Sequence, residues 1–320
     1  MKKNTEARNH HWVPQCYLKG FAKSRSKNAT LFVVDAVGQK TFETVPRNVA
    51  SARDFNRIDV PGVSPNQIES DFANFEGMVA KALERLAIAK RFGTDEDQNL
   101  ILNLIALLSA RNPRMRENSR SVQERVAKVV MDMTLSSKER YESSFKRAAR
   151  DGFVAPDSDV TYEAMREFVD RGEYTISVST TRHVEQELKL VDTILPLLGA
   201  RTWILISAPQ GAGGFITSDH PVVLQWSEKR DRGMFTSPGF GLRDTEVIFA
   251  VSQDMVMVGT FDGRHGDIEA TPEVMAKING IIAAHSNRQI YAKDDRFRYA
   301  VGSGEIRRGA DILRDLGQPE

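Results

Sequence analysis

Apolar residues at helical spacing dominate the middle of the chain. From Ile68 to Leu86 they recur every three or four positions, which predicts a helix with one apolar face. Ser64 and Pro65 supply a capping side chain and a proline suited to the first helical position, so we expect this helix to begin at Pro65. Residues 100–108 are apolar on nearly every side, which predicts that a second helix, starting at Asp95, is the most buried.

Changes of pattern divide the rest of the chain into further elements. Asn112 precedes a proline, which disfavours helical geometry and predicts a break there. Amphipathic patterns and a second cap-and-proline pair predict helices over residues 114–133, 138–150, 161–171, 183–198 and 271–288. Runs of β-branched and aromatic residues predict strands over residues 30–34, 40–45, 203–208, 215–217, 222–224, 246–251, 255–260 and 289–292. The last residues, from Ala310 on, are expected to fray.

These elements predict an α+β protein in which a helical bundle packs against a mostly antiparallel β-sheet. Their order gives an N-terminal motif segment with a β-hairpin (residues 1–63), a helical region (64–199), a sheet region with one long helix (200–300) and a C-terminal tail (301–320). No repeat or low-complexity tract interrupts the chain. We expect these regions to form one compact unit.

Composition limits the cellular compartments and the partners that we expect for the protein, but it does not indicate an activity. The 320 residues include 44 basic and 43 acidic side chains, so no overall field attracts nucleic acid or an anionic membrane. The longest apolar run, residues 100–108, is too short to cross a bilayer, and the N-terminus has no signal-peptide core. The single cysteine, Cys16, excludes an internal disulfide and agrees with a reducing compartment. We therefore expect a cytoplasmic protein without membrane contact, whose oligomeric state the sequence leaves open.

The residues richest in chemistry lie near the N-terminus. Two imidazoles, an amide and a phenol are crowded there, on His10, His11, Gln15 and Tyr17. A neutral imidazole such as that of His11 can act as a general base near pH 7 or bind a metal. In the alternative interpretation, His11 hydrogen-bonds a neighbouring strand and the aromatic residues pack in the core.

A second candidate is the segment Thr217-Ser218-Asp219-His220-Pro221, which lies between two predicted strands. A carboxylate at a strand end, such as that of Asp219, is held firmly enough to bind a metal or orient a histidine. An Asx-type turn, in which Asp219 caps its own backbone, explains the same pattern.

Residues 111–150 carry eleven Lys and Arg against five Asp and Glu. This local excess of positive charge is the strongest indication in the chain of a polyanion-binding surface, and it makes nucleic acid a candidate partner. A solvated helical face explains the excess equally well, because only Tyr141 and Phe145 could stack on bases there.

Several of these residues carry a family resemblance. The opening motif His11-x-Val13-Pro14-Gln15-x-Tyr17-Leu18-x-x-Phe21 resembles that of the bacterial family catalogued as domain of unknown function 4238. The resemblance extends over residues 9–292 through Asp54-Phe55-Asn56, the helix from Ile68-Glu69 to Phe75-Glu76, Arg111-Asn112-Pro113, the segment from Phe215 to Pro221, Asn279, and Arg288 to Ala292. Cys16 and His220 depart from the family pattern, which has an aromatic residue and usually asparagine at these positions.

The resemblance implies that these positions matter, although the family has no settled activity. If they converge, they could form a metal-assisted phosphodiesterase or nuclease with His11 as base, Glu76 and Asp219 holding a divalent cation, and Arg111 neutralising a phosphoryl oxygen. The side chains expected to bind substrate are those of His10, Gln15, Tyr17, Arg111 and Asn279. The alternative is a non-catalytic binding or interaction protein in which the same residues form a buried structural network. A catalytic set opens to solvent and shows shifted pKa values, whereas a structural set is closed and fully paired.

Overall fold

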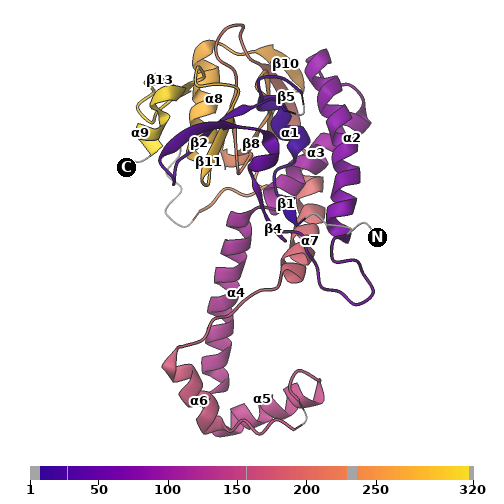
Figure 1. Ribbon diagram of the computed structural model, residues 1–320, viewed down its shortest axis with the longest axis vertical. Coiled ribbons are helices and arrows are strands. Elements are labelled where there is room, and N and C mark those ends of the chain that lie inside the picture. Colours follow the sequence, from indigo (N-terminus) through magenta and orange to yellow (C-terminus); the bar gives the residue numbers. More distant parts are fainter. Residues whose placement is uncertain (1–7, 27, 156, 229–235, 317–320) are drawn as a thin grey trace. The chain divides into compact units, whose positions relative to one another are not determined.

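The computed structural model describes residues 8–26, 28–155, 157–228 and 236–316 (Figure 1). The α-helices of these residues are α1 (Gln15–Leu18), α2 (Gln67–Ala89), α3 (Asp95–Ala110), α4 (Pro113–Thr134), α5 (Lys138–Arg150), α6 (Tyr162–Arg171), α7 (Thr180–Gly199), α8 (Pro272–Ala284) and α9 (Ile312–Leu316). Short 3-10 turns add η1 (Lys19–Phe21), η2 (Pro46–Asn48) and η3 (Gly309–Asp311). None of these helices combines the length and the apolar character that a membrane span requires.

The strands form two larger sheets and two short ribbons. The five-stranded sheet has the order β10 (Gly266–Glu269), β5 (Thr202–Ser207), β9 (Met255–Thr260), β8 (Thr245–Ser252) and β7 (Val222–Trp226). The four-stranded sheet has the order β3 (Lys40–Thr44), β2 (Leu31–Asp35), β11 (Gln289–Ala292) and β6 (Thr217–Ser218). The ribbons pair β1 (Asn9–His11) with β4 (Ser51–Arg53), and β12 (Arg298–Ala300) with β13 (Ile306–Arg308). Among the described strands only β10 and β5 pair in parallel, so the predicted α+β class with mostly antiparallel sheets is confirmed.

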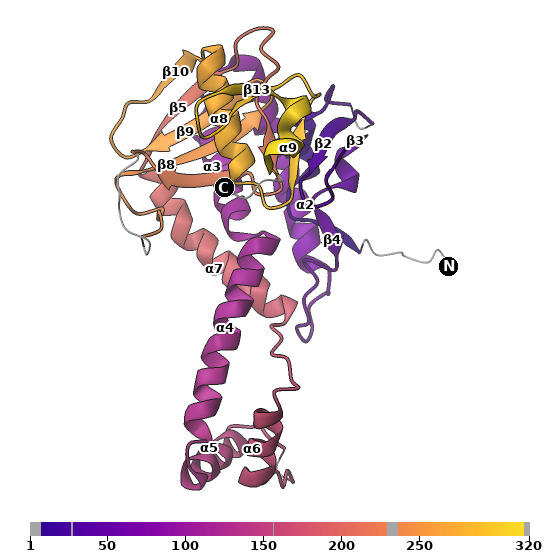
Figure 2. The same cartoon turned by 90° about the vertical axis from the view of Figure 1, so that its left-hand side faces the viewer.

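The chain divides into two compact units. Residues 1–113 and 180–320 form the larger unit, and residues 114–179, with α4, α5 and α6, form the smaller one. One compact unit was expected from the sequence. In the larger unit α3 packs against both α2 and α7, and nearly all of its side chains after residue 100 are buried, as its apolar pattern predicts. In the smaller unit α5 and α6 contact each other (Figure 2).

Several helix bounds differ from prediction by a few residues, α7 for example beginning at Thr180 and not at His183. At two of these bounds, main-chain groups are engaged elsewhere. Helix α2 begins at Gln67 and not at Pro65, whose carbonyl oxygen accepts a hydrogen bond from the main-chain N–H of Ile58. Helix α8 ends at Ala284, well before Arg288, whose main-chain N–H donates to a distant carboxylate. A main-chain N–H or C=O group that is bonded in this way is not available for the hydrogen bonds of a helix.

Strand β6 and the C-terminal segment also differ from prediction. Strand β6 covers Thr217–Ser218 and not residues 215–217, because the N–H of Phe215 donates to the carbonyl of Gln253. The segment expected to fray from Ala310 instead forms η3 and α9, where Ile312 packs into the core. Residues 317–320 of that segment lie outside the described chain.

Candidate functional site: the His10–Arg111 cluster

Strand β1 brings the N-terminal histidines next to the end of α3. His10 is fully buried, and its Nδ1 accepts a hydrogen bond of 2.9 Å from the main-chain N–H of Asn56. The Asn56 side chain donates to Glu69 at 2.6 Å and accepts from Nε of Arg111 at 3.1 Å. Arg111 also donates to the main-chain carbonyl of His11. We call these residues, together with Glu76, the His10–Arg111 cluster.

Arg111 is the central cation of the cluster. It caps the C-terminus of α3, immediately before the break at Asn112 that the sequence predicts, and its side chain is 2% exposed. The guanidinium lies over the ring of Phe72 with its carbon 4.2 Å from the ring centre, a cation–π contact. These contacts hold Arg111 as a buried anchor between α2, α3 and the N-terminal segment.

Glu76 lies two helical turns after Glu69 on α2, so both carboxyl groups point to the same side of the helix. Burial, opposed by the charge of Arg111 and aided by that of Glu69, raises the pKa of Glu76 to about 7. Within the described chain its carboxyl group makes no hydrogen bond, and the residue is partly exposed. Glu76 is therefore a carboxyl group that exchanges a proton near neutral pH.

His11 differs from its neighbour His10 because its ring is partly exposed. Its Nε2 lies 3.2 Å from the carbonyl oxygen of Arg47 in turn η2. A carbonyl can only accept, so Nε2 carries the proton and Nδ1 keeps a lone pair. Burial lowers the pKa of His11, so the imidazole is neutral at pH 7. The alternative interpretation was a hydrogen bond from His11 to a neighbouring strand, whereas the partner of its Nε2 lies in turn η2.

The other residues of the N-terminal motif differ in their surroundings. Burial, and to a smaller extent the negative charge of Glu76, raises the pKa of Cys16 to about 12, so its side chain stays a thiol. Tyr17 is fully buried, and its hydroxyl lies 2.6 Å from Oγ1 of Thr217 and 2.7 Å from the carbonyl of Ala250. Gln15 is partly exposed at the start of α1.

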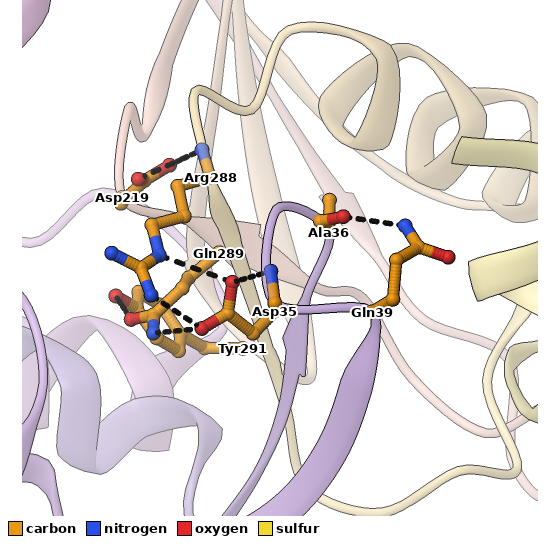
Figure 3. A network of polar contacts seen from close by, with 8 residues as sticks. Asp35, Ala36, Gln39, Asp219, Arg288, Gln289 and Tyr291 are labelled. Atoms are coloured by element: carbon orange, nitrogen blue, oxygen red, sulfur yellow. Dashed lines mark hydrogen bonds and ion pairs between the residues drawn. The ribbon is translucent and has the colours of Figure 1, made fainter. Parts of the chain in front are cut away.

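Asp219 lies in a second network, with Arg288 and Asp35 (Figure 3). Its carboxylate accepts hydrogen bonds from the main-chain N–H groups of Asn287 at 2.9 Å and Arg288 at 3.0 Å. It therefore caps a distant turn, whereas the local turn is closed by the hydroxyl of Ser218. Burial raises the pKa of Asp219 despite these bonds.

The Arg288 side chain extends this second network to the C-terminal end of β2, an inner strand of the four-stranded sheet. Its Nε and Nη2 donate to the two carboxylate oxygens of Asp35 at 3.0 and 2.9 Å (Figure 3). This bond lowers the pKa of Asp35 to about 2. The indole N–H of Trp12 donates to the carbonyl of Asp219 at 3.1 Å and so connects the second network to the N-terminal segment.

Asn279 occupies a third place, fully buried on α8. Its side chain accepts from the N–H of Ile216 at 3.1 Å and donates to the carbonyls of Gly214 and Arg298 at 3.0 and 2.8 Å. All of these partners are main-chain groups. Asn279 thereby fixes the approach to β6 and joins it to β12.

The structure thus brings together some of the predicted site residues and separates others. His10, His11, Glu76 and Arg111 lie in one cluster, whereas the Asp219, Asn279 and Tyr17 side chains have other partners. Asp219 is not among the charged groups that shift the pKa of Glu76. The described chain contains no group of three or more His, Cys, Asp or Glu placed to hold a metal ion, so joint binding of a cation by Glu76 and Asp219 stays a prediction.

Several residues of these networks were not among the predicted site residues. Asn56, Glu69 and Arg288 belong to motifs that carry the family resemblance, which was the available signal for them. Asp35 lies inside an ordinary strand, and nothing in the sequence indicates that it pairs with Arg288 across more than 250 positions.

Fold and site together define an α+β protein whose N-terminal motif is anchored by buried polar networks. The family model described as a protein of unknown function, DUF4238, matches residues 9–296, and the chain belongs to that family. No curated protein and no solved structure matches the chain.

Proposed function

We propose that the protein is a hydrolase of phosphodiesters in which His11 and Glu76 exchange protons with the substrate. One observation carries the proposal. Nδ1 of His11 and the carboxyl group of Glu76 make no hydrogen bond within the described residues, and both residues are partly exposed. Both also lie close enough to Arg111 for its charge to act on their pKa values. Shifted protonation in a partly exposed cluster is typical of catalytic groups.

The protonation states suit a general acid–base mechanism. Neutral His11 takes a proton from water at Nδ1 as the water oxygen forms a bond to phosphorus. Glu76 in its protonated form gives a proton to the leaving oxygen as the second phosphorus–oxygen bond breaks. The products are a phosphate monoester and an alcohol, and the two side chains regain their starting states by exchange with solvent.

The rim of the cluster supports an anionic substrate. Arg47 provides the carbonyl that binds His11, and its own side chain is exposed. Arg53 lies on β4, which pairs with the strand that carries His11, and its side chain is 73% exposed, with a 3.5 Å ion pair to the neighbouring Asp54. Arg111 is enclosed by its partners, so we assign it the role of positioning residue.

The nature of the substrate and the setting of the protein are inferred from the sequence. We infer a cytoplasmic, bacterial protein acting on nucleic acid, with residues 111–150 as a candidate contact. The charge of this segment is partly offset, because residues 151–179 hold seven acidic against two basic side chains. Lys138 pairs with Glu163, and Arg150 pairs with Asp151. Any nucleic-acid contact there is therefore weaker than the sequence count suggests.

The test is cleavage of single-stranded RNA and DNA by the purified chain, in chelator and with magnesium, manganese or zinc. The variants are His11→Gln and Glu76→Gln, with Glu84→Gln as the matched control, an exposed glutamate on the same helix. Cleavage that both site variants lose and the control keeps supports the proposal. No cleavage by a folded wild-type chain under any of these conditions contradicts it.

A non-catalytic interaction protein is the second candidate, and one observation favours it. The buried side chains of His10, Arg111, Asn279 and Asp219 all bond to main-chain groups, as in a structural network. Absence of cleavage together with a large loss of thermal stability in a His10→Ala variant would support this candidate and direct attention to a binding partner.

A further inference from the structure

The smaller unit exposes a row of apolar side chains along α4. Val122, Val126, Val129 and Met133 follow at steps of four, three and four residues, and Val130 lies beside them. Each of the five is between 53% and 59% exposed. This spacing places them on one face of the helix, in the pattern of a coiled-coil seam. We call these five residues the α4 stripe.

The stripe continues into a cleft at the C-terminal end of α4. The cleft has a volume of about 490 Å³, and Val130 and Met133 form one wall of it. Residues Glu139, Arg140 and Ser143 of α5 form the opposite wall. An apolar side chain arriving along the stripe would have space there beside Met133.

Two charged residues border the stripe on the same edge. Arg125 and Asp132 are seven residues apart, which places them on one line along the helix. Asp132 has no ion pair in the described chain, and Arg125 makes only a 3.4 Å bond to the carbonyl of Ser121 in its own helix. When two copies of such a helix pack antiparallel, the positive residue of one copy lies beside the negative residue of the other, and the two can form an ion pair.

We propose that the α4 stripe is a homodimer interface in which α4 of one chain packs antiparallel against α4 of a second copy. In the register that places Val126 against Val129 of the second copy, Val122 contacts Met133 of the second copy and enters the cleft beside that residue. In this register Arg125 lies beside Asp132 of the second copy, and the two-fold symmetry repeats the pair. A parallel arrangement would place Arg125 against Val130, leaving the guanidinium without an acceptor.

The test is sedimentation velocity of the full chain between about 1 and 100 µM, a range in which an interface of a few helical turns is expected to dissociate. Wild type is expected to be dimeric at the upper end. Val126→Glu should be monomeric with unchanged circular dichroism, since the side chain is exposed in the single chain. Val37→Glu, at an exposed apolar position in the larger unit, is the control and should still dimerise.

The charged pair tests the register. Arg125→Glu alone and Asp132→Arg alone should each weaken dimerisation by about tenfold or more, and the double variant should restore it because the charges again face opposite partners. A wild-type chain that is monomeric throughout overturns the proposal, as does a dimer that Val126→Glu leaves intact. A dimer broken by Val126→Glu but without rescue in the double variant overturns the antiparallel register and indicates a different packing of the stripe.

Discussion

Glu76→Gln removes a carboxyl group whose ionisation opposes folding. Burial raises the folded-state pKa of Glu76 from 4.5 to about 7. A raised folded pKa means that the folded chain holds the proton more tightly than the unfolded chain. The stability that this proton contributes is complete below pH 4.5 and is lost as the pH rises through 7. Glutamine keeps the shape of the protonated acid and cannot ionise.

The magnitude follows from the difference between the two pKa values. A shift of about 2.5 units corresponds to about 3 kcal/mol once both states are ionised, and about 2 kcal/mol of this is already lost at pH 6. Relative to wild type, Glu76→Gln should therefore be more stable by about 3 kcal/mol at pH 8 and nearly equal at pH 4.5. For a chain of this size, 3 kcal/mol corresponds to roughly 5 °C in Tm.

The assay is thermal or urea unfolding of both chains at several pH values from 4.5 to 8.5. The control is Glu84→Gln, an exposed position on the same helix, which should follow wild type at every pH. Equal stability of Glu76→Gln and wild type at pH 8 would refute the reasoning. So would a difference that is the same at pH 4.5 and pH 8, because that difference would not depend on ionisation.

Three further predictions concern packing and ion pairing. His10→Ala leaves the buried N–H of Asn56 without its acceptor and should cost about 2 to 3 kcal/mol in urea unfolding; a loss below 0.5 kcal/mol would contradict the buried bond. Asp35→Asn should cost about 2 kcal/mol at pH 7, because the Arg288 guanidinium lowers the pKa of Asp35 to about 2. That contribution is present above pH 3.8 and lost as the pH falls toward 2, so the difference between the chains should shrink with acid; a constant difference would contradict it. Gly280→Ala puts a methyl group onto a main-chain carbonyl of β12 and should lower stability by about 3 kcal/mol or prevent folding, whereas an unchanged Tm would show that the two elements separate easily.

The sequence predicted the start of a helix correctly where an interaction between neighbouring residues determines it. Helices α3 and α5 begin at the expected residues because a side chain caps each start, Thr94 and Ser137 respectively. The short ribbons, such as β1 with β4, were missed because three residues carry too little periodicity to be read. Strand β10 was missed because all four of its side chains are exposed.

The site was only partly predictable because its partners are distant in sequence. The resemblance and the residue types pointed to His11, Glu76 and Arg111. Arg111 donates to the main-chain carbonyl of His11, and its charge acts on the pKa values of both His11 and Glu76. No sequence pattern could show that Arg111 would be enclosed, or that the Asp219 carboxylate would bond to main-chain amides 68 and 69 positions away. Such pairings depend on how strands far apart in sequence come together.

The most direct test of the proposed function is the pH dependence of phosphodiester cleavage by the wild-type chain and by Glu76→Gln. His11 must be deprotonated, and burial places its pKa below 6.5, while Glu76 must be protonated, with a pKa of about 7. The account predicts a bell-shaped rate that falls in acid as His11 becomes protonated and falls in alkali as Glu76 ionises near pH 7, and a strongly reduced rate without the alkaline fall in the variant. A rate that does not change between pH 5 and 9, or an unaltered profile in Glu76→Gln, would contradict the assignment of His11 and Glu76 as the proton-exchanging pair.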